Sequence, residues 1–245
     1  MKFLIQKIDG ELRHDFAFTL LESIRFNNWL GRKMSYRFID TKNGYYPKFL
    51  PLHKNYIPIG SVEFVIAFLQ YFHSITPKPI NIPDELLPLE HTQRFVFNGV
   101  ETEIQGKKFV KSNDSYKSFA DIVNDNTDIP MGNYQISDVI EIESEWRAFV
   151  YNGKLVGLQR YAGYFTQFPD IFPIRCMINA YKSAPIAYTL DVGINANGTF
   201  IIECHPMVSV GLYGFSDHTI LPYMFARAFN EIKTINLNYD NKKYF

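Results

Sequence analysis

Two Asn-Gly turns place the strongest constraint on the fold of this chain. Residues 145–161 read EWRAFVYNGKLVGLQRY, in which apolar and polar residues alternate on both sides of Asn152-Gly153. Residues 187–205, AYTLDVGINANGTFIIECH, form a second such pattern around Asn197-Gly198. Asn-Gly suits the positive φ angles of a tight hairpin turn, so both stretches predict antiparallel hairpins. We therefore expect the second half of the chain to contain antiparallel sheet.

The N-terminal part of the chain predicts an α/β unit. Strand-like residues 2–8 and 34–39 flank a segment with helical periodicity over 14–30. A further apolar helix, with Glu63 in its first turn, follows directly after Ser61, and a hydroxyl at such a junction is typical of a helix N-cap. Free N–H groups at a helix N-terminus can hold an anion, so Ser61 is either an ordinary cap or part of a substrate site.

A proline-rich stretch, TPKPINIPDELLPLE, separates this unit from the second half. We expect it to be an extended connection that divides the chain into domains at residues 1–92 and 93–245. Beyond it, RFVFNG and KKFVKS predict strands, and SYKSFADIVND predicts a short helix. Further helices are expected over residues 170–183 and 218–235. With the hairpins, these elements predict an α+β fold.

Composition narrows the class of protein. Lysine plus arginine and aspartate plus glutamate number 25 each, so the net charge of zero argues against a general binder of nucleic acid or anionic membranes. No apolar run is long enough to cross a bilayer, and the N-terminus MKFLIQKIDG becomes polar too soon for a signal peptide. The two cysteines, Cys176 and Cys204, lie in no metal or redox spacing. A reduced, cytoplasmic protein is expected.

Two acids and a histidine in the second hairpin are candidate metal ligands. Successive strand residues point to opposite faces, so Glu203 and His205 share one face and Cys204 points to the other. Asp191 lies on the neighbouring strand among apolar residues, where a carboxylate is costly unless it binds a cation or is hydrogen-bonded. Oxygen ligands of this kind suit Mg²⁺ bridged to phosphates. Salt bridges at a strand edge are the alternative interpretation.

Two lysines stand upstream of the hairpins. Lys111 ends the strand-like KKFVK, and Lys117 follows the polar residues SNDSY, at the start of the expected short helix. Two such ammonium groups can bind the oxygens of a triphosphate as point charges. Solvated surface lysines are the alternative.

The stretch SDVIEIESEWRAFV combines features of a nucleoside site. The apolar pair Val139-Ile140 is extended, and free backbone groups beside it can read an adenine edge. Glu145 can reach ribose hydroxyls, and Arg147 shares its strand face and can bind a carboxylate or phosphate with two hydrogen bonds. A surface Glu/Arg ladder would look the same in sequence.

The order of these features resembles the ATP-grasp superfamily, and most closely the clade marked by one arginine and two lysines. The matching stretches are FVKS, EWRAFV, TLDVGI and IIECHPMVSVGLYG, with PIGSVE upstream. The resemblance implies that ATP lies between two α+β subdomains, about residues 93–140 and 141–245, with the N-terminal α/β domain on the substrate side. It also implies activation of a carboxylate and attack by an amine or similar nucleophile.

Carried over residue by residue, the resemblance implies that Lys111 binds the α- and β-phosphates and Lys117 the outer phosphates. Arg147 would stabilise the transferring γ-phosphoryl group or the acyl phosphate. Val139 and Ile140 would form the adenine hinge. The remaining implied ligands are Glu145 for the ribose, and Asp191, Glu203 and His205 for Mg²⁺.

The sequence departs from the family pattern at two positions. His205 stands where most members have asparagine, and imidazole is a poorer Mg²⁺ ligand than an amide oxygen, so metal preference is expected to shift toward Mn²⁺. Thr189 stands where many relatives have arginine, so Arg147 or Arg160 would supply that charge. Arg94 and the Ser61 helix end are expected to complete the pocket for the non-nucleotide substrate.

We therefore expect an ATP-dependent, Mg²⁺-requiring carboxylate–amine ligase that works through an acyl phosphate. The sequence does not identify the substrates and leaves an amino acid, a peptide and a modified nucleotide open. Two alternatives remain open: a phosphotransferase that uses the same ATP site on a hydroxyl acceptor, and a non-catalytic nucleotide-binding or interaction domain.

Overall fold

The computed structural model of the protein describes residues 1–42, 48–125 and 127–241, with side chains up to residue 234. The chain forms two compact units. Unit 1 contains Met1–Pro77, Pro185–Ala187 and the chain from Pro206 onward, and unit 2 contains Lys78–Ala184 and Tyr188–His205. The expected domain limits, 1–92 and 93–245, stay a prediction. No helix among the described residues is both long and apolar enough to span a membrane.

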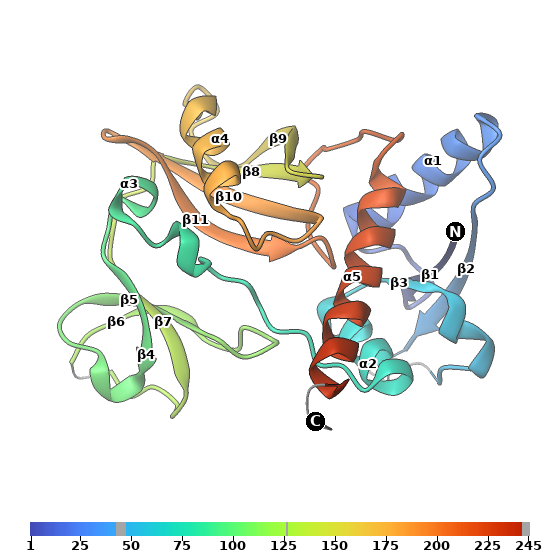
Figure 1. Ribbon diagram of the computed structural model, residues 1–245, viewed down its shortest axis with the longest axis horizontal. Helices are drawn as coiled ribbons and strands as arrows, with labels where there is room; N and C mark the ends of the chain where they lie inside the picture. The colour runs from blue at the N-terminus through green and yellow to red at the C-terminus, as the bar shows by residue number, and fades with distance from the viewer. Residues whose placement is uncertain (43–47, 126, 242–245) are drawn as a thin grey trace. The chain divides into compact units, whose positions relative to one another are not determined.

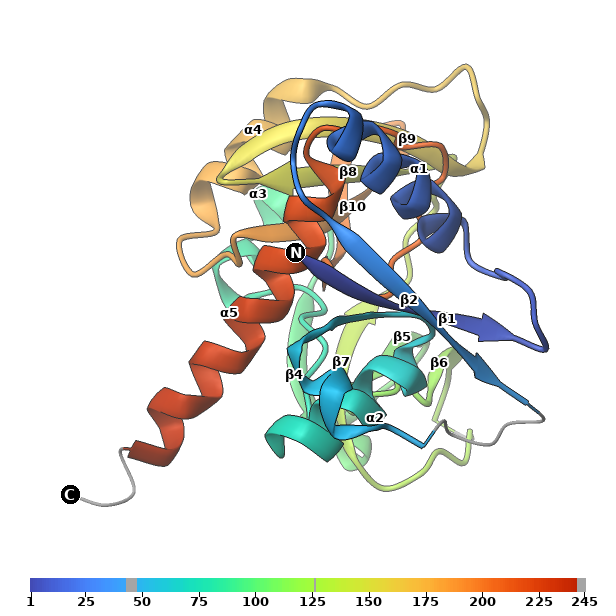
Figure 2. The same cartoon turned by 90° about the vertical axis from the view of Figure 1, so that its right-hand side faces the viewer.

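Unit 1 is built on a parallel sheet of three strands in the order β2-β1-β3 (Figure 1). Helices α1 and α5 pack together, and both α2 and α5 contact β3 (Figure 2). The elements are β1 Lys2–Ile8, α1 Asp15–Trp29, β2 Ser35–Thr41, β3 Ile57–Ile59, α2 Val62–His73 and α5 Leu221–Asn241, with a short 3-10 helix at Pro51–Asn55.

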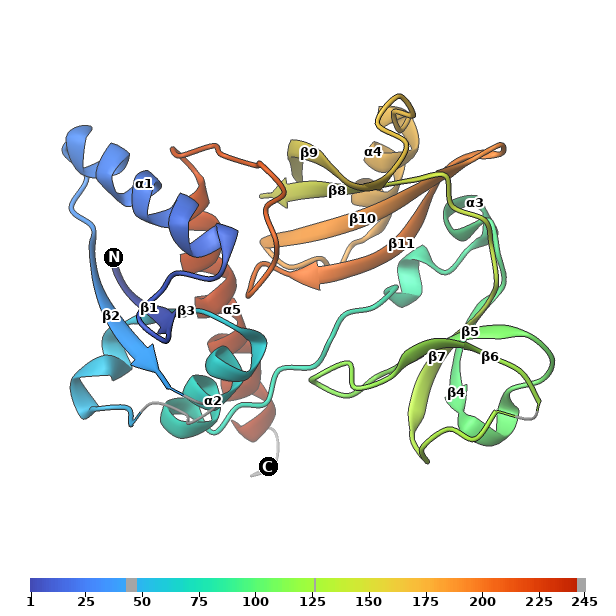
Figure 3. The same ribbon diagram turned by 180° about the vertical axis from the view of Figure 1, so that it is seen from behind.

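Unit 2 contains two antiparallel sheets of four strands. The small sheet has the order β4-β7-β5-β6 and the large sheet the order β11-β10-β8-β9. Helix α4 lies against β9 (Figure 3). The elements are α3 Leu89–Thr92, β4 Val96–Val100, β5 Lys108–Ser112, β6 Ala120–Val123, β7 Asn133–Asp138, β8 Ser144–Tyr151, β9 Lys154–Gly163, α4 Ile171–Ala180, β10 Ala187–Asn195 and β11 Gly198–Pro206, with 3-10 helices at Asp84–Leu86 and Glu101–Glu103.

The parallel N-terminal sheet and the antiparallel sheets of unit 2 confirm the predicted α+β class. Both Asn-Gly hairpins are present, and Asn152 and Gly153 have φ angles of 50° and 68°. Among its described residues, unit 2 contains two apolar clusters. One is centred on residues such as Leu190 in the large sheet and also includes Val96 of β4, and the other is centred on residues such as Ile136 in the small sheet.

The expected short helix over residues 115–125 is wrong. The segment forms a turn followed by strand β6, which pairs antiparallel with β5. Asp114 accepts hydrogen bonds from the N–H groups of Tyr116 and Ser118, and Lys117 has a φ of 50°, so the helical path is interrupted at its start. The β-branched pair Ile122-Val123 then favours a strand.

Three smaller differences concern elements that were not expected and the start of the last helix. Strand β7 (Asn133–Asp138) was not expected, the proline-rich connection contains α3 and a 3-10 turn, and the last helix begins at Leu221 instead of residue 218. At that last point Asp217 accepts hydrogen bonds from the N–H groups of Thr219 and Ile220, which hold a separate turn before the helix.

Candidate nucleotide and metal site

Strands β10 and β11 bring three potential metal ligands together in unit 2. The Nε2 atom of His205 lies 3.2 Å from Glu203 Oε1 and 3.5 Å from Asp191 Oδ2. Cys204, between Glu203 and His205, is fully buried on the opposite face and belongs to the core of the large sheet. Strand alternation therefore places the acid and the imidazole on one face, next to the acid of the adjoining strand.

Asp191 is held by Arg147 from β8. The guanidinium donates from Nε to Oδ1 at 2.8 Å and from Nη2 to Oδ2 at 2.7 Å, and both side chains are buried. Burial by itself raises the pKa of Asp191, but hydrogen bonds from Arg147 and His205 outweigh it and hold that pKa below its ordinary value. Asp191 is therefore an anion with a fixed orientation, as a metal ligand has to be.

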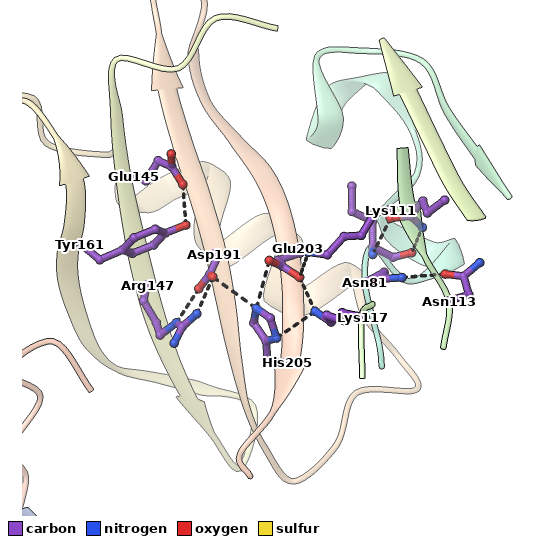
Figure 4. Close-up of polar contacts among 12 residues, drawn as sticks. Asn81, Lys111, Asn113, Lys117, Glu145, Arg147, Tyr161, Asp191, Glu203 and His205 are labelled. Carbon is purple, nitrogen blue, oxygen red and sulfur yellow. Dashed lines mark hydrogen bonds and ion pairs between the residues drawn. The ribbon is translucent and has the colours of Figure 1, made fainter. Parts of the chain in front are cut away.

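Glu203 faces two ammonium groups supplied by the small-sheet side of unit 2 (Figure 4). Lys111, on β5, donates to Oε2, and Lys117 donates to the same oxygen at 2.5 Å. Burial opposes ionisation of Glu203, but His205 and the two lysines lower its pKa far below the ordinary value. Burial also lowers the pKa of Lys117, and the charge of Glu203 partly offsets this effect.

The turn between β5 and β6 places the second lysine. Asp114 accepts hydrogen bonds from Tyr116 N at 2.8 Å and from the Ser118 hydroxyl at 2.5 Å, and its main-chain carbonyl accepts from Lys117 N at 3.1 Å. Lys117 therefore projects from a constrained left-handed position. Sequence analysis did not identify Asp114, although an Asp followed four residues later by Ser within a polar segment is a recognisable turn signal.

The donor set fits a small divalent cation. The three ligand atoms lie within 4.8 Å of one another. Neighbouring ligands around an octahedral Mg²⁺ or Mn²⁺ at about 2.1 Å are separated by about 3 Å, close to the 3.2 Å and 3.5 Å found around His205 Nε2. Thr189 Oγ1, on the same face of β10 as Asp191, is also buried with no hydrogen-bond partner among the described residues. The residues present thus fit a metal.

His205 also contacts Lys117 through its other ring nitrogen, with 3.1 Å between Nδ1 and Nζ. An ammonium group can only donate, so in this contact Nδ1 is the acceptor and a neutral imidazole carries its proton on Nε2. Ligation of a metal through Nε2 requires the other tautomer and hence the release of Lys117.

Residues 93–222, more than half of the chain, match the family model described as ATP-grasp domain, R2K clade family 2. The chain belongs to this ATP-grasp family. The matched range includes both lysines, Arg147 and the three ligand residues. The resemblance inferred from sequence is confirmed.

Solved structures agree with this assignment at the level of the fold. D-alanine–D-alanine ligase from Bacillus anthracis, complexed with ATP, is similar with a TM-score of 0.52 and 13% identity, over 96% of this chain and 99% of that one. N5-carboxyaminoimidazole synthetase from Staphylococcus aureus gives 0.51 and 12%, over 95% of this chain and 78% of that one. These similarities confirm the ATP-grasp fold. No curated protein matches the chain in sequence.

In this ATP-grasp protein the expected ribose ligand is already hydrogen-bonded. Glu145 Oε2 accepts from the Tyr161 hydroxyl at 2.7 Å, and the Tyr161 ring lies 5.7 Å from the Arg147 guanidinium carbon. Burial, together with the charges of Asp191 and Glu145, raises the pKa of Tyr161 well above its ordinary value, so the hydroxyl remains a donor. Sequence analysis did not identify Tyr161, because the contact joins two strands of a hairpin and follows no local motif.

The remaining expected nucleotide and substrate residues lie around these strands. Val139 and Ile140 lie in the connection between β7 and β8, and Val139 is 41% exposed. Arg160 is on β9, where it donates to the carbonyl of Gly163 at 2.9 Å. Their roles in binding stay predictions.

Arg94 and Ser61 both have structural hydrogen bonds. Arg94 donates to the carbonyls of Thr92 at 3.0 Å and Ile201 at 2.9 Å, and burial lowers its pKa to about 10. Ser61, in unit 1, is the N-cap of α2 and accepts from Phe64 N at 3.3 Å. A role of either residue in binding substrate also stays a prediction.

Proposed function

We propose that this protein is an ATP- and Mg²⁺-dependent ligase that joins a carboxylate to an amine or similar nucleophile through an acyl phosphate. One observation carries the proposal: two lysines from the small-sheet side meet Glu203 beside Asp191 and His205 of the large sheet. Members of the ATP-grasp superfamily are generally ATP-dependent ligases, which supports the same chemistry here.

The charges of the site suit a phosphorylated ligand. The cluster has three positive charges, from Lys111, Lys117 and Arg147. It has two negative charges, from Asp191 and Glu203, so its net charge is +1 when His205 is neutral. We assign Lys111 to the α- and β-phosphates and Lys117 to the outer phosphates. Such groups lower the barrier to phosphoryl transfer by positioning and by neutralising charge.

We assign binding of the cation and of the nucleoside to residues already described. Mg²⁺, or Mn²⁺, would be held by Asp191, Glu203 and His205 and would supply further neutralisation of phosphate charge. Val139 and Ile140 would contact the adenine and Glu145 the ribose. For the carboxylate and amine substrates we assign Ser61, Arg94 and Arg160.

The reaction balances in two steps. A carboxylate oxygen of the substrate attacks the γ-phosphorus, the bond to the β,γ-bridging oxygen breaks, and ADP leaves. The amine nitrogen then attacks the acyl carbon and the C–O bond to phosphate breaks. Inorganic phosphate leaves, and the nitrogen gives up one proton to the departing phosphate or to solvent as the amide forms. Arg147, next to Asp191, is placed to offset negative charge on the transferring group.

The test combines ATP binding with trapping of the intermediate. The protein is titrated with Mg-ATP in a calorimeter and then incubated with Mg-ATP, hydroxylamine and a panel of amino acids, short peptides and carboxylated nucleotides. We expect binding, and for the true substrate equal amounts of ADP, free phosphate and hydroxamate. ADP without free phosphate would identify a phosphotransferase instead. Binding without turnover across the panel would favour a non-catalytic domain, and no binding would contradict the nucleotide site itself.

A further inference from the structure

Asn81 and Ile82, which we call the connector, are hydrogen-bonded to both sheets of unit 2. On the large-sheet side, Cys204 N on β11 donates to Asn81 O at 2.7 Å. On the small-sheet side, the Gln135 amide of β7 accepts from Ile82 N and donates to Ile82 O, each at 2.9 Å. The Asn81 side chain adds a bond to Asn113 Oδ1 at 2.6 Å.

These contacts end within two residues of the charged groups of the candidate site. Cys204 lies between Glu203 and His205, and Gln135 lies directly opposite Lys111 in the β5–β7 register. Asn113 follows Lys111 by two residues. Figure 4 shows Asn81 and Asn113 next to one another, on the same side of the site as Lys111 and away from Arg147 and Asp191.

The connector is buried and its conformation is specific. Asn81 is 2% exposed and has a φ of 53°, a left-handed conformation that asparagine tolerates better than most residues. Gln135 is 7% exposed, so loss of its amide would leave the buried N–H and C=O of Ile82 without partners, which destabilises the connector. Main-chain hydrogen bonding of Ile82 therefore depends on one side chain from the small sheet.

We propose that Asn81 and Gln135 are positioning residues that set the spacing between the strand of Lys111 and the strand of Glu203. Val96 of β4 packs into the core of the large sheet together with Ile82, whereas the rest of the small sheet has a core of its own. The polar contacts through the connector therefore add to a limited apolar contact in holding one sheet against the other. The importance of this spacing for nucleotide binding rests on the proposed function, because phosphates held by Lys111 must reach a cation held by Glu203. A misplacement of about 1 Å in such a site costs on the order of 100-fold in rate.

The test measures the spacing directly in the full chain. Spin labels are attached at Ile122→Cys on β6 and Lys154→Cys on the β8–β9 hairpin, both exposed positions, in a Cys176→Ser background that keeps the buried Cys204. Double electron–electron resonance then gives the distribution of distances between the sheets. We expect one narrow distribution without substitution in the connector network, and a distribution at least twice as broad in Asn81→Gly and in Gln135→Leu.

A matched control separates positioning from general loss of stability. Thr199→Val removes a partly buried hydrogen bond, 2.8 Å long, from Asp170 N to Thr199 Oγ1, which does not involve the small sheet. It should lower the melting temperature without broadening the distribution. Asn81→Gly keeps the left-handed backbone, so it tests the connector even where Gln135→Leu fails to fold.

Nucleotide affinity provides the second readout. We expect the dissociation constant for Mg-ATP to rise about tenfold in Asn81→Gly and to stay unchanged in Thr199→Val. An unchanged distance distribution in folded Asn81→Gly would overturn the positioning role. Broadening in a protein that never binds Mg-ATP would retain that role and contradict the proposed function instead.

Discussion

Lys111 and Lys117 reach the same carboxylate oxygen by different local routes. Lys111 projects from a regular strand, whereas Lys117 projects from a left-handed turn position. Both contact Glu203 Oε2, and both side chains are largely shielded from solvent. The alternative that these are solvated surface lysines is therefore wrong, whatever ligand they bind.

We predict that Lys111→Ala and Lys117→Ala each weaken Mg-ATP binding about 10- to 100-fold, because each removes a charge-assisted hydrogen bond to phosphate worth about 1.5–3 kcal/mol. Isothermal titration measures the effect, and circular dichroism checks the fold. Lys108→Ala is the matched control, since Lys108 lies on the same strand and pairs with Asp138 at 2.6 Å. Equal losses in all three variants would indicate a general effect of charge.

At single positions, the sequence predicted which face of a strand a side chain occupies better than it predicted which residues that side chain contacts. The alternation of residues 203–205 predicted that Glu203 and His205 share a face, and their ligand atoms lie close to that of Asp191. Asn81 and Gln135 were missed. Their contacts join residues more than 30 positions apart in the chain, and no local pattern encodes such pairs.

At the scale of elements, the turn after β5 was the main error. Its residues have the apolar spacing of a short helix, but the side chain of Asp114 and the left-handed Lys117 stabilise a turn. Local hydrogen bonds to an Asp side chain compete with helix formation, and the spacing of apolar residues does not reveal them. Strand β7 was missed for a related reason, since it pairs with two strands that are distant in sequence.

The same turn should make stability depend on acid pH. Burial opposes ionisation of Asp114, but hydrogen bonds from Ser112, Ser118 and the N–H of Tyr116 lower its pKa from 3.8 to about 2. A carboxyl whose pKa is lowered on folding stabilises the fold above its unfolded pKa, and this contribution is lost as pH falls toward 2.

We predict that Asp114→Asn lowers the free energy of unfolding at pH 7 by about 1 kcal/mol, after allowance for solvent screening. The difference from the parent protein should shrink between pH 4 and pH 2. Urea titrations followed by circular dichroism across this range measure it. A difference that stays constant with pH would show that the ionised carboxylate does not stabilise the turn.

At the scale of the whole molecule, the two hairpins and the order of the charged residues were sufficient to predict the family and the fold class. The composition of the two units was not predictable in the same way. The chain enters unit 1 briefly at residues 185–187 and returns to it after residue 205, so each unit combines segments that are separated in sequence. Periodicity identifies segments, whereas long-range packing decides which segments form one unit.

Mg-ATP should stabilise the protein against heat. A ligand at about 100 times its dissociation constant adds about 2.7 kcal/mol to the free energy of unfolding, which corresponds to about 5–10 °C in a chain of this size. Differential scanning calorimetry with and without saturating Mg-ATP measures the shift. If the two units unfold separately, only the transition of unit 2 should move, and a thermogram with no shift would contradict the ATP site.

The sharing of Glu203 by two lysines has a thermodynamic consequence. The carboxylate proposed to hold the cation is the partner of the ammonium groups proposed to hold the phosphates. Each ligand then releases what the other needs, so the two ligands should bind cooperatively. By linkage, the factor by which ATP raises the affinity for Mn²⁺ equals the factor by which Mn²⁺ raises the affinity for ATP. Titrations along both routes of the cycle should give one cooperativity factor, on the order of 5 to 150. A factor of one would mean that nucleotide and cation bind to this protein independently.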